Sequence, residues 1–199
     1  MGETILKLGP DDTGLRLSAA EYAAAEWQRP YRFERVHGRV VAMSPSGPEH
    51  RWSAGILRRE LDAYWRDHTD VVQFVDFEGW VATSPDDDRL PDICVYLRGS
   101  ADREKVPHRV PELIFEFVSE SRRDQERDYI YKREEYHRVG VKEYVIVDRF
   151  KASALVLTWR KGDYAERVLG IADDYTSPLL PGFTVALRDV LTPEEGWAG

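Results

Sequence analysis

Two carboxylates in this chain of 199 residues lie in stretches that are otherwise apolar. Asp92 comes directly before the apolar run 93–97, and Glu116 lies inside the run 113–118. Both runs are typical of buried strands. A carboxylate that is buried without a partner costs several kcal/mol, or it binds a proton and becomes neutral. A chain that keeps two of them near neighbouring strands usually has a cation to hold, so the pair predicts a divalent-metal site.

The strand around Glu116 is apolar on both faces apart from the glutamate itself. Side chains alternate along a strand, so Glu116 shares one face with Ile114 and Val118. A strand that is apolar on both faces is typical of the centre of a sheet. A structural ion pair with a buried arginine explains this glutamate as well as a metal does, and both interpretations stay open.

A helix is expected after this strand, and Lys132 lies within its apolar stripe. At about 100° per residue, Lys132 falls in the same arc as Tyr129, Tyr136 and Val139. One interpretation is a lysine that reaches out to solvent and pairs with Asp128, four residues earlier. The sharper interpretation is that the amine points inward and approaches the same site as the two acids.

Together, these three side chains would suit metal-assisted hydrolysis of a phosphodiester. Asp92 and Glu116 offer hard oxygen ligands for Mg²⁺ or Mn²⁺, and the backbone carbonyl of Phe117 would add another. Such an ion lowers the pKa of a bound water and neutralises phosphate charge. Lys132 would orient the attacking water and stabilise the transition state electrostatically.

Glu34 and His50 form a second tier of candidates. Glu34 lies in an expected hairpin, and His50 begins the first long helix. A strand-edge hydrogen bond explains Glu34, and a contact at the helix N-terminus explains His50; these interpretations are slightly favoured. Arginines also crowd the second helix and its entry. They are interpreted as a solvated face rather than a phosphate-binding patch, and are Arg122, Arg123, Arg127 and Arg133.

Composition limits the class of protein. Hydrophobic residues make up 42% and charged residues 32%, and no apolar stretch approaches the roughly 20 residues of a membrane span. No signal peptide is evident, and the single cysteine, Cys94, cannot form an internal disulfide. We therefore expect a cytoplasmic protein with no membrane contact. The net charge of −8 argues against a protein that coats DNA, but not against an enzyme with a local basic patch.

The order of expected elements favours one domain over residues 1–199 with a mixed sheet. Residues 1–17 are expected to be a loose N-terminal lead-in, and Ser18 and Glu21 form a capping box that opens a short helix to about Trp27. The other expected elements are, in order, a hairpin over 32–43, a helix over about 49–68, a strand over 71–82, a turn over 84–88, strands over 92–97 and 113–118, a helix from Ser121 to Gly140, strands over 143–148 and 152–159, a strand from Tyr164, and a short strand near 183–187.

The spacing of the acids resembles the PD-(D/E)XK nuclease superfamily. Pro91 and Asp92 are followed by Glu116, 24 residues after the aspartate. That motif usually has a lysine two positions after the second acid, and here the position is Val118. Some branches of the superfamily carry the lysine on the following helix, and Lys132 matches that variant.

The wider chain resembles one such branch, the Uma family of bacterial restriction-endonuclease-like proteins. The matching segments are 33–34, 37–38, 43–45, His50, Leu57, Leu61, 91–93, Glu116, Ser119, Ser121, Asp128, Lys132, Tyr136, 140–144, 146–148 and 179–182. The resemblance implies a restriction-endonuclease-like core over about 30–185, of α/β (α+β) class, with a central mixed β-sheet flanked by helices and an N-terminal β-hairpin. It also implies Mg²⁺-dependent cleavage of DNA, and a homodimer is expected because related nucleases often pair to cut two strands.

Two rival functions remain. A catalytically inactive nucleic-acid- or protein-binding module that retains the fold would explain the acidic charge and Val118. A carboxylate-pair hydrolase acting on a sugar or an ester would need acids on either side of an open groove.

Overall fold

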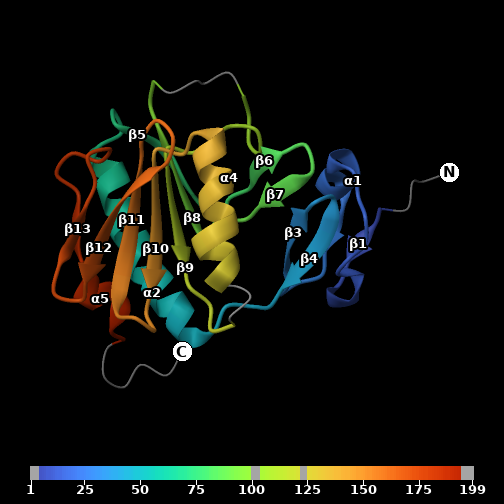
Figure 1. The fold of residues 1–199 in the computed structure, drawn as a ribbon, viewed down its shortest axis with the longest axis horizontal. Helices are drawn as coiled ribbons and strands as arrows, with labels where there is room; N and C mark the ends of the chain where they lie inside the picture. The colour runs from blue at the N-terminus through green and yellow to red at the C-terminus, as the bar shows by residue number, and fades with distance from the viewer. Residues whose placement is uncertain (1–4, 100–103, 122–124, 194–199) are drawn as a thin grey trace.

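The computed structural model describes residues 5–99, 104–121 and 125–193. A six-stranded sheet in the order β12-β11-β10-β9-β8-β5 forms its centre, and helices α2 and α4 cover opposite faces of this sheet (Figure 1). The strands of the sheet are β5 (Val72–Phe77), β8 (Ile93–Leu97), β9 (Leu113–Phe117), β10 (Glu143–Asp148), β11 (Ser153–Trp159) and β12 (Tyr164–Gly170). Strands β9 and β10 are parallel and the other neighbours antiparallel, so the predicted mixed sheet is confirmed.

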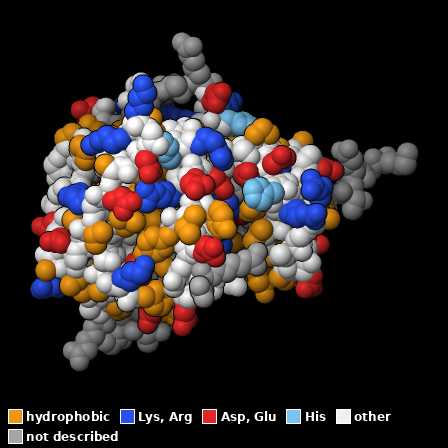
Figure 2. All heavy atoms as spheres, viewed as in Figure 1, with side chains coloured by type: hydrophobic (Ala, Val, Ile, Leu, Met, Phe, Trp, Pro, Cys, Tyr) orange, Lys and Arg blue, Asp and Glu red, His pale blue; other side chains and the backbone are white. Residues whose placement is uncertain are grey.

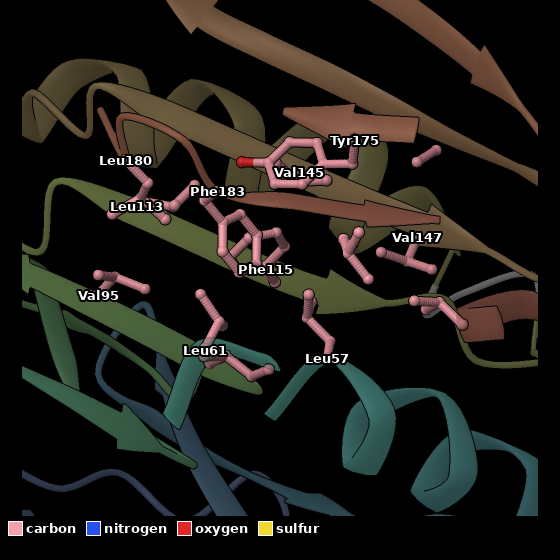
Figure 3. Packing of buried hydrophobic residues seen from close by; sticks show 14 of the residues in the cluster. Leu57, Leu61, Val95, Leu113, Phe115, Val145, Val147, Tyr175, Leu180 and Phe183 are labelled. Carbon is pink, nitrogen blue, oxygen red and sulfur yellow. The ribbon is translucent and has the colours of Figure 1, made fainter. Parts of the chain in front are cut away.

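Helix α2 (Pro48–Asp67) packs its apolar stripe on one face of this sheet. Figure 3 shows Leu57 and Leu61 pointing toward Phe115 and its neighbours on the strands. Fully burying side chains of this size contributes roughly 1.5–3 kcal/mol each. The main core therefore fixes α2, and with it His50 near the first turn, against the strand that carries Glu116.

Helix α4 (Lys132–Val139) packs on the other face. Its Tyr136 is buried with Ile114 and Val118 and meets Tyr144 edge-to-face, with ring centroids 5.0 Å apart. The predicted alternation along β9 is confirmed, because Leu113, Phe115 and Phe117 belong to the α2 side. The helix ends at Gly140, whose φ of 93° gives the left-handed C-terminal conformation that glycine adopts without strain.

A π-helical turn, Arg127–Tyr131, leads into α4. The backbone N–H of Lys132 donates to the carbonyl of Arg127, five residues earlier, where an α-helix would use the fourth. Such turns occur often at functional sites. The helix was predicted to begin at Ser121, and residues 122–124 of that prediction lie outside the described residues.

A second sheet, of order β4-β3-β7-β6, lies beside the first (Figure 1). Its strands are β3 (Arg32–Val36), β4 (Arg39–Met43), β6 (Val81–Ser84) and β7 (Asp87–Arg89). Strands β3 and β4 are the predicted hairpin, and both turn residues, His37 and Gly38, have positive φ, as a tight two-residue hairpin turn requires. Strand β3 of this second sheet contains Glu34, whose side chain points toward the central six-stranded sheet.

The N-terminal segment differs from the loose lead-in predicted for residues 1–17. Strand β1 (Lys7–Leu8) pairs with β2 (Glu26–Trp27), a 3-10 turn covers Pro10–Asp12, and Leu8 is buried; residues 1–4 lie outside the described part of the chain. The Ser18 capping box opens α1 (Ala19–Ala24) as predicted, but the helix stops before β2.

The single strand predicted over 71–82 is wrong. It is divided between the two sheets, because Glu78 has a φ of 59° and the chain turns at Gly79. A Cβ atom at Gly79 would lie 2.6 Å from the sulfur of Cys94, so the turn needs glycine there. The turn predicted over 84–88 contains β7, which pairs with β3 and β6.

Near the C-terminus, β13 (Asp174–Thr176) pairs with β14 (Thr184–Ala186), and α5 (Leu187–Leu191) follows. Helix α5 was not predicted, because five residues are too few to show helical periodicity. No helix in the described ranges combines the length and hydrophobicity that a membrane span needs.

Candidate active site

Asp92 and Glu116 meet at the end of the β8–β9 pairing. The antiparallel register pairs Ile93 with Phe115, so its next step places Asp92 opposite Glu116. Side chains directly opposite each other in such a pair have Cβ atoms roughly 4.5–5.5 Å apart. Both carboxylates are almost fully buried, at 9% and 3% exposure. The two acids that sequence singled out therefore lie in one place.

Lys132 reaches this place from α4. Its Nζ lies 2.7 Å from Oε1 of Glu116, 3.2 Å from Oε1 of Glu34 and 3.4 Å from Oδ1 of Asp128. The side chain is 1% exposed, so it does not reach out to solvent, although it does contact Asp128 as the alternative interpretation held. The alternative for Glu116 is also decided: its charged partner is this lysine and not an arginine.

Glu34 is a central member of this network, and the strand-edge hydrogen bond expected for it is only part of its role. It is fully buried, and its carboxylate contacts Lys132, accepts a hydrogen bond from the N–H of Leu90 and pairs with Arg89 at 3.0 Å. Arg89 in turn forms two hydrogen bonds with Glu135, of 2.6 and 2.7 Å. Glu34 thus ties the second sheet to the lysine.

Asp92 has a separate set of partners. Its Oδ2 accepts a hydrogen bond of 2.9 Å from the N–H of Phe117, and its Oδ1 lies 3.3 Å from Nε2 of His50 and 3.4 Å from Nη2 of Arg32. His50 also rests against the ring of Phe117, with centroids 5.5 Å apart. The expected role of His50, a contact at the helix N-terminus, is therefore incomplete, because its ring faces the candidate site.

Electrostatics separates the two acids. Burial alone raises the pKa of Asp92, but the hydrogen bond and charge of His50, together with Arg32, outweigh burial and hold that pKa well below its usual range. Burial raises the pKa of Glu116, and Asp92 and Asp128 add to the rise although Lys132 opposes it. Glu116, the more deeply buried of the two acids, is therefore harder to ionise than Asp92 unless a further cation is nearby.

Lys132 remains protonated. Burial lowers the pKa of its amine, but the carboxylates of Glu116, Glu34 and Asp128 outweigh burial and raise that pKa above its usual value. An amine in this state supplies positive charge and three N–H donors rather than a base.

The site opens to solvent on the Asp92 side. A cleft of about 490 Å³ is lined by Asp92, His50 and Arg32, by Arg51 and Arg58 of α2, and by Phe77 and others. Glu116 and Lys132 lie behind Asp92 and are not part of this lining. A ligand therefore reaches Asp92 first.

The described residues contain no group of three or more His, Cys, Asp or Glu side chains arranged for a metal ion. Two carboxylates and a backbone carbonyl remain the candidate donors, since Phe117 adjoins both acids through its backbone. Glu60 of α2 pairs with Arg59 and does not join these donors.

The arginines of the second helix do not form a patch of one sign. Arg133 pairs with the exposed acids Glu166 and Asp163, whereas Arg127 pairs with the buried Asp128, which the solvated-face interpretation did not predict. Arg122 and Arg123 lie outside the described residues. Figure 2 shows acidic, basic and hydrophobic side chains interspersed over the face that carries α4.

Sequence reasoning missed Arg32, Arg89 and Glu135 as neighbours of the site. Arg89 lies between the turn predicted over 84–88 and the strand predicted from 92, where a buried arginine gives no periodic signal. Glu135 follows Lys132 by three residues, and this i, i+3 spacing on the inward face could have indicated it.

Comparisons with known proteins identify the family and the fold of this chain. The Uma2 family model, described as a putative restriction endonuclease, matches residues 19–188. The crystal structure of a putative nuclease belonging to DUF820 from Anabaena variabilis superposes with a TM-score of 0.71 at 12% identity, covering 88% of this chain and 97% of that one, which shows a shared fold. Among curated proteins, none matches the chain. Because the family model covers most of the sequence, the chain belongs to the Uma2 family.

Proposed function

We propose that this protein is a divalent-metal-dependent endonuclease that hydrolyses phosphodiester bonds in DNA. The observation that carries the proposal is the convergence of a buried lysine and two buried acids: Lys132 lies 2.7 Å from Glu116, and Glu116 lies opposite Asp92. The family match and the nuclease-like fold support the same reaction class.

The residues fit a hard divalent cation. Mg²⁺ is usually bound by one or two carboxylates and keeps several waters, so it does not need a third acidic side chain. Asp92, Glu116 and the carbonyl of Phe117 would hold Mg²⁺ or Mn²⁺. Burial raises the pKa of Glu116 despite the nearby ammonium of Lys132, so a further cation would stabilise the ionised form of this carboxylate. When bound, the ion supplies charge neutralisation at the phosphate and a water of lowered pKa.

Lys132 has two roles in this proposal. Its ammonium group holds Glu116 in place, because the Oε1 of that residue also accepts a hydrogen bond of 3.0 Å from Tyr136 and is thereby fixed from two sides. It also places a permanent positive charge behind the acids, where it stabilises negative charge that develops on the phosphate. Since the lysine stays protonated, it does not take a proton from water.

A non-catalytic binding module is the second candidate, and one observation favours it. Both acids already have cationic neighbours from the protein: Arg32 and His50 for Asp92, and Lys132 for Glu116. Titration calorimetry with Mn²⁺ separates the two functions, because the module would bind no metal.

The direct test is cleavage of supercoiled plasmid in Mg²⁺ or Mn²⁺ by the wild type, Asp92→Asn and Glu116→Gln. Both substitutions keep the size of the side chain, so we expect folded proteins whose cleavage is lost. Glu143→Gln is the matched control, because Glu143 is a buried glutamate on the next strand whose partner, Tyr175, packs in the core on the face of the sheet opposite Glu116. Equal cleavage by the wild type and both site variants would reject the proposal.

A further inference from the structure

One flank of α2 forms a wall of the cleft that leads to Asp92. The residues of α2 in this wall are His50, Arg51, Ala54, Gly55 and Arg58. Positions 51, 54, 55 and 58 follow the i, i+3, i+4, i+7 spacing of one helix face. This face lies beside the buried stripe of Leu57 and Leu61, so it is a second organised surface of the same helix.

The middle of this helix face carries only small side chains, at Ala54 and Gly55. Gly55 has no side chain, and a Cβ atom there would meet no other heavy atom within 4 Å. Ala54 beside it is the smallest side chain that still favours a helix. A glycine in the middle of a 20-residue helix costs stability, and no packing contact in the described residues accounts for it. Ala54 and Gly55 therefore form a shallow surface between Arg51 and Arg58, which we call the floor of the cleft.

Arg51 and Arg58 are positioned at the ends of this floor with their charge available. Arg51 donates a hydrogen bond of 3.3 Å to the carbonyl of Ser46, and within the described ranges it has no salt bridge. Arg58 lies over the ring of Phe77, 3.9 Å from its centroid, and forms a salt bridge of 3.8 Å with Asp62 on an exposed surface. The ring contact orients the guanidinium without neutralising it, and an exposed i, i+4 ion pair is weak enough to give way to a phosphate.

The spacing of the two arginines fits a nucleic-acid strand. Seven residues of helix span about 10.5 Å along the axis. One strand of DNA carries a phosphate about every 3.4 Å along its axis, so the interval corresponds to roughly three nucleotide steps. The protein has a net charge of −8, so such a strand needs a local positive surface of this kind.

We propose that this face of α2 is a track for the sugar-phosphate backbone of one DNA strand, with Arg51 and Arg58 binding phosphates and the floor at Ala54 and Gly55 admitting the strand toward Asp92. The proposal rests on the proposed nuclease function, but it concerns binding without metal and is tested separately from cleavage.

The test measures binding of a fluorescent 20-base-pair DNA duplex in EDTA over a range of salt concentrations. We expect the double variant Arg51→Gln/Arg58→Gln to bind at least about tenfold more weakly, because two charge-assisted contacts to phosphate are lost. The slope of log Kd against log salt should fall by about 1.8, because each lost phosphate contact removes about 0.9.

The matched control is Arg59→Gln/Arg66→Gln, which removes the same charge from the same helix. Both arginines are largely exposed and pair with their neighbours Glu60 and Asp67 outside the cleft. We expect the affinity and the salt slope of the control to match the wild type. Equal weakening by the two double variants would show that only net charge matters, and no weakening by the first would show that the strand lies elsewhere; either result overturns the track.

Gly55→Leu tests the floor without changing any charge. The open space around Gly55 and the better helix propensity of leucine predict a folded protein. We expect weaker binding with an unchanged salt slope, and wild-type affinity would contradict passage over this floor. None of these measurements uses metal or cleavage. Wild-type cleavage by both Asp92→Asn and Glu116→Gln would therefore reject the proposed function without deciding the result of these binding measurements.

Discussion

The amine of Lys132 lies 2.7 Å from the carboxylate of Glu116, and the two groups are held from opposite directions by the strand β9 and the helix that follows it. Tyr136, one turn later on α4, donates to the same oxygen. The packing of α4 on the sheet therefore determines this contact, and it cannot be lost without disturbing the core on that face.

Replacing Lys132 by methionine should destabilise the protein by about 3–5 kcal/mol, because three buried carboxylates lose their shared cation. Urea unfolding at pH 7 measures this change. The double variant Lys132→Met/Glu116→Gln should be less destabilised than the sum of its single variants, since the unpaired charge is also removed. Simple additivity would mean that the two side chains do not interact as the structure describes.

Glu34 gives a prediction about pH. Although burial opposes it, the charges of Lys132 and Arg89 lower the pKa of Glu34 to about 2 from 4.5. A group whose pKa is lower in the folded state contributes stability above its unfolded pKa and loses that contribution as pH falls through its folded pKa. The contribution of Glu34 should therefore be complete above about pH 4.5 and disappear progressively toward pH 2.

The measurement is the free energy of unfolding of the wild type and Glu34→Gln between pH 6 and pH 3. We expect the wild type to be more stable at pH 6 and the difference to shrink as the pH is lowered. A difference between wild type and Glu34→Gln that stays constant over this range would contradict the lowered pKa.

Local hydrophobic patterns in the sequence were sufficient to predict the strands and helices at the centre of the fold. Glu116 and Lys132 could be predicted because each interrupts an apolar pattern whose period indicates a strand or a helix. Arg89 could not, because its burial depends on β7, a strand of three residues formed only through its partners β3 and β6. The same holds for the division at Glu78 and Gly79, where contact with Cys94, fifteen residues further along, decides the path of the chain. Sequence pattern thus identified the charged groups of the site but not the neighbours that hold them.

His50 should affect metal binding without carrying the metal. Its Nε2 lies 3.3 Å from Oδ1 of Asp92, so it orients a carboxylate proposed to be a ligand. Loss of a group that positions a metal ligand typically costs about 10–100-fold in metal affinity. We expect calorimetry to show Mn²⁺ affinity reduced by this factor in His50→Ala. His68→Ala, at the other end of the same helix, where the ring stacks on Tyr64, is the control and should bind Mn²⁺ like the wild type. Equal Mn²⁺ affinity in His50→Ala and the wild type would show that Asp92 is held by Arg32 and the Phe117 N–H alone, and would remove His50 from the site.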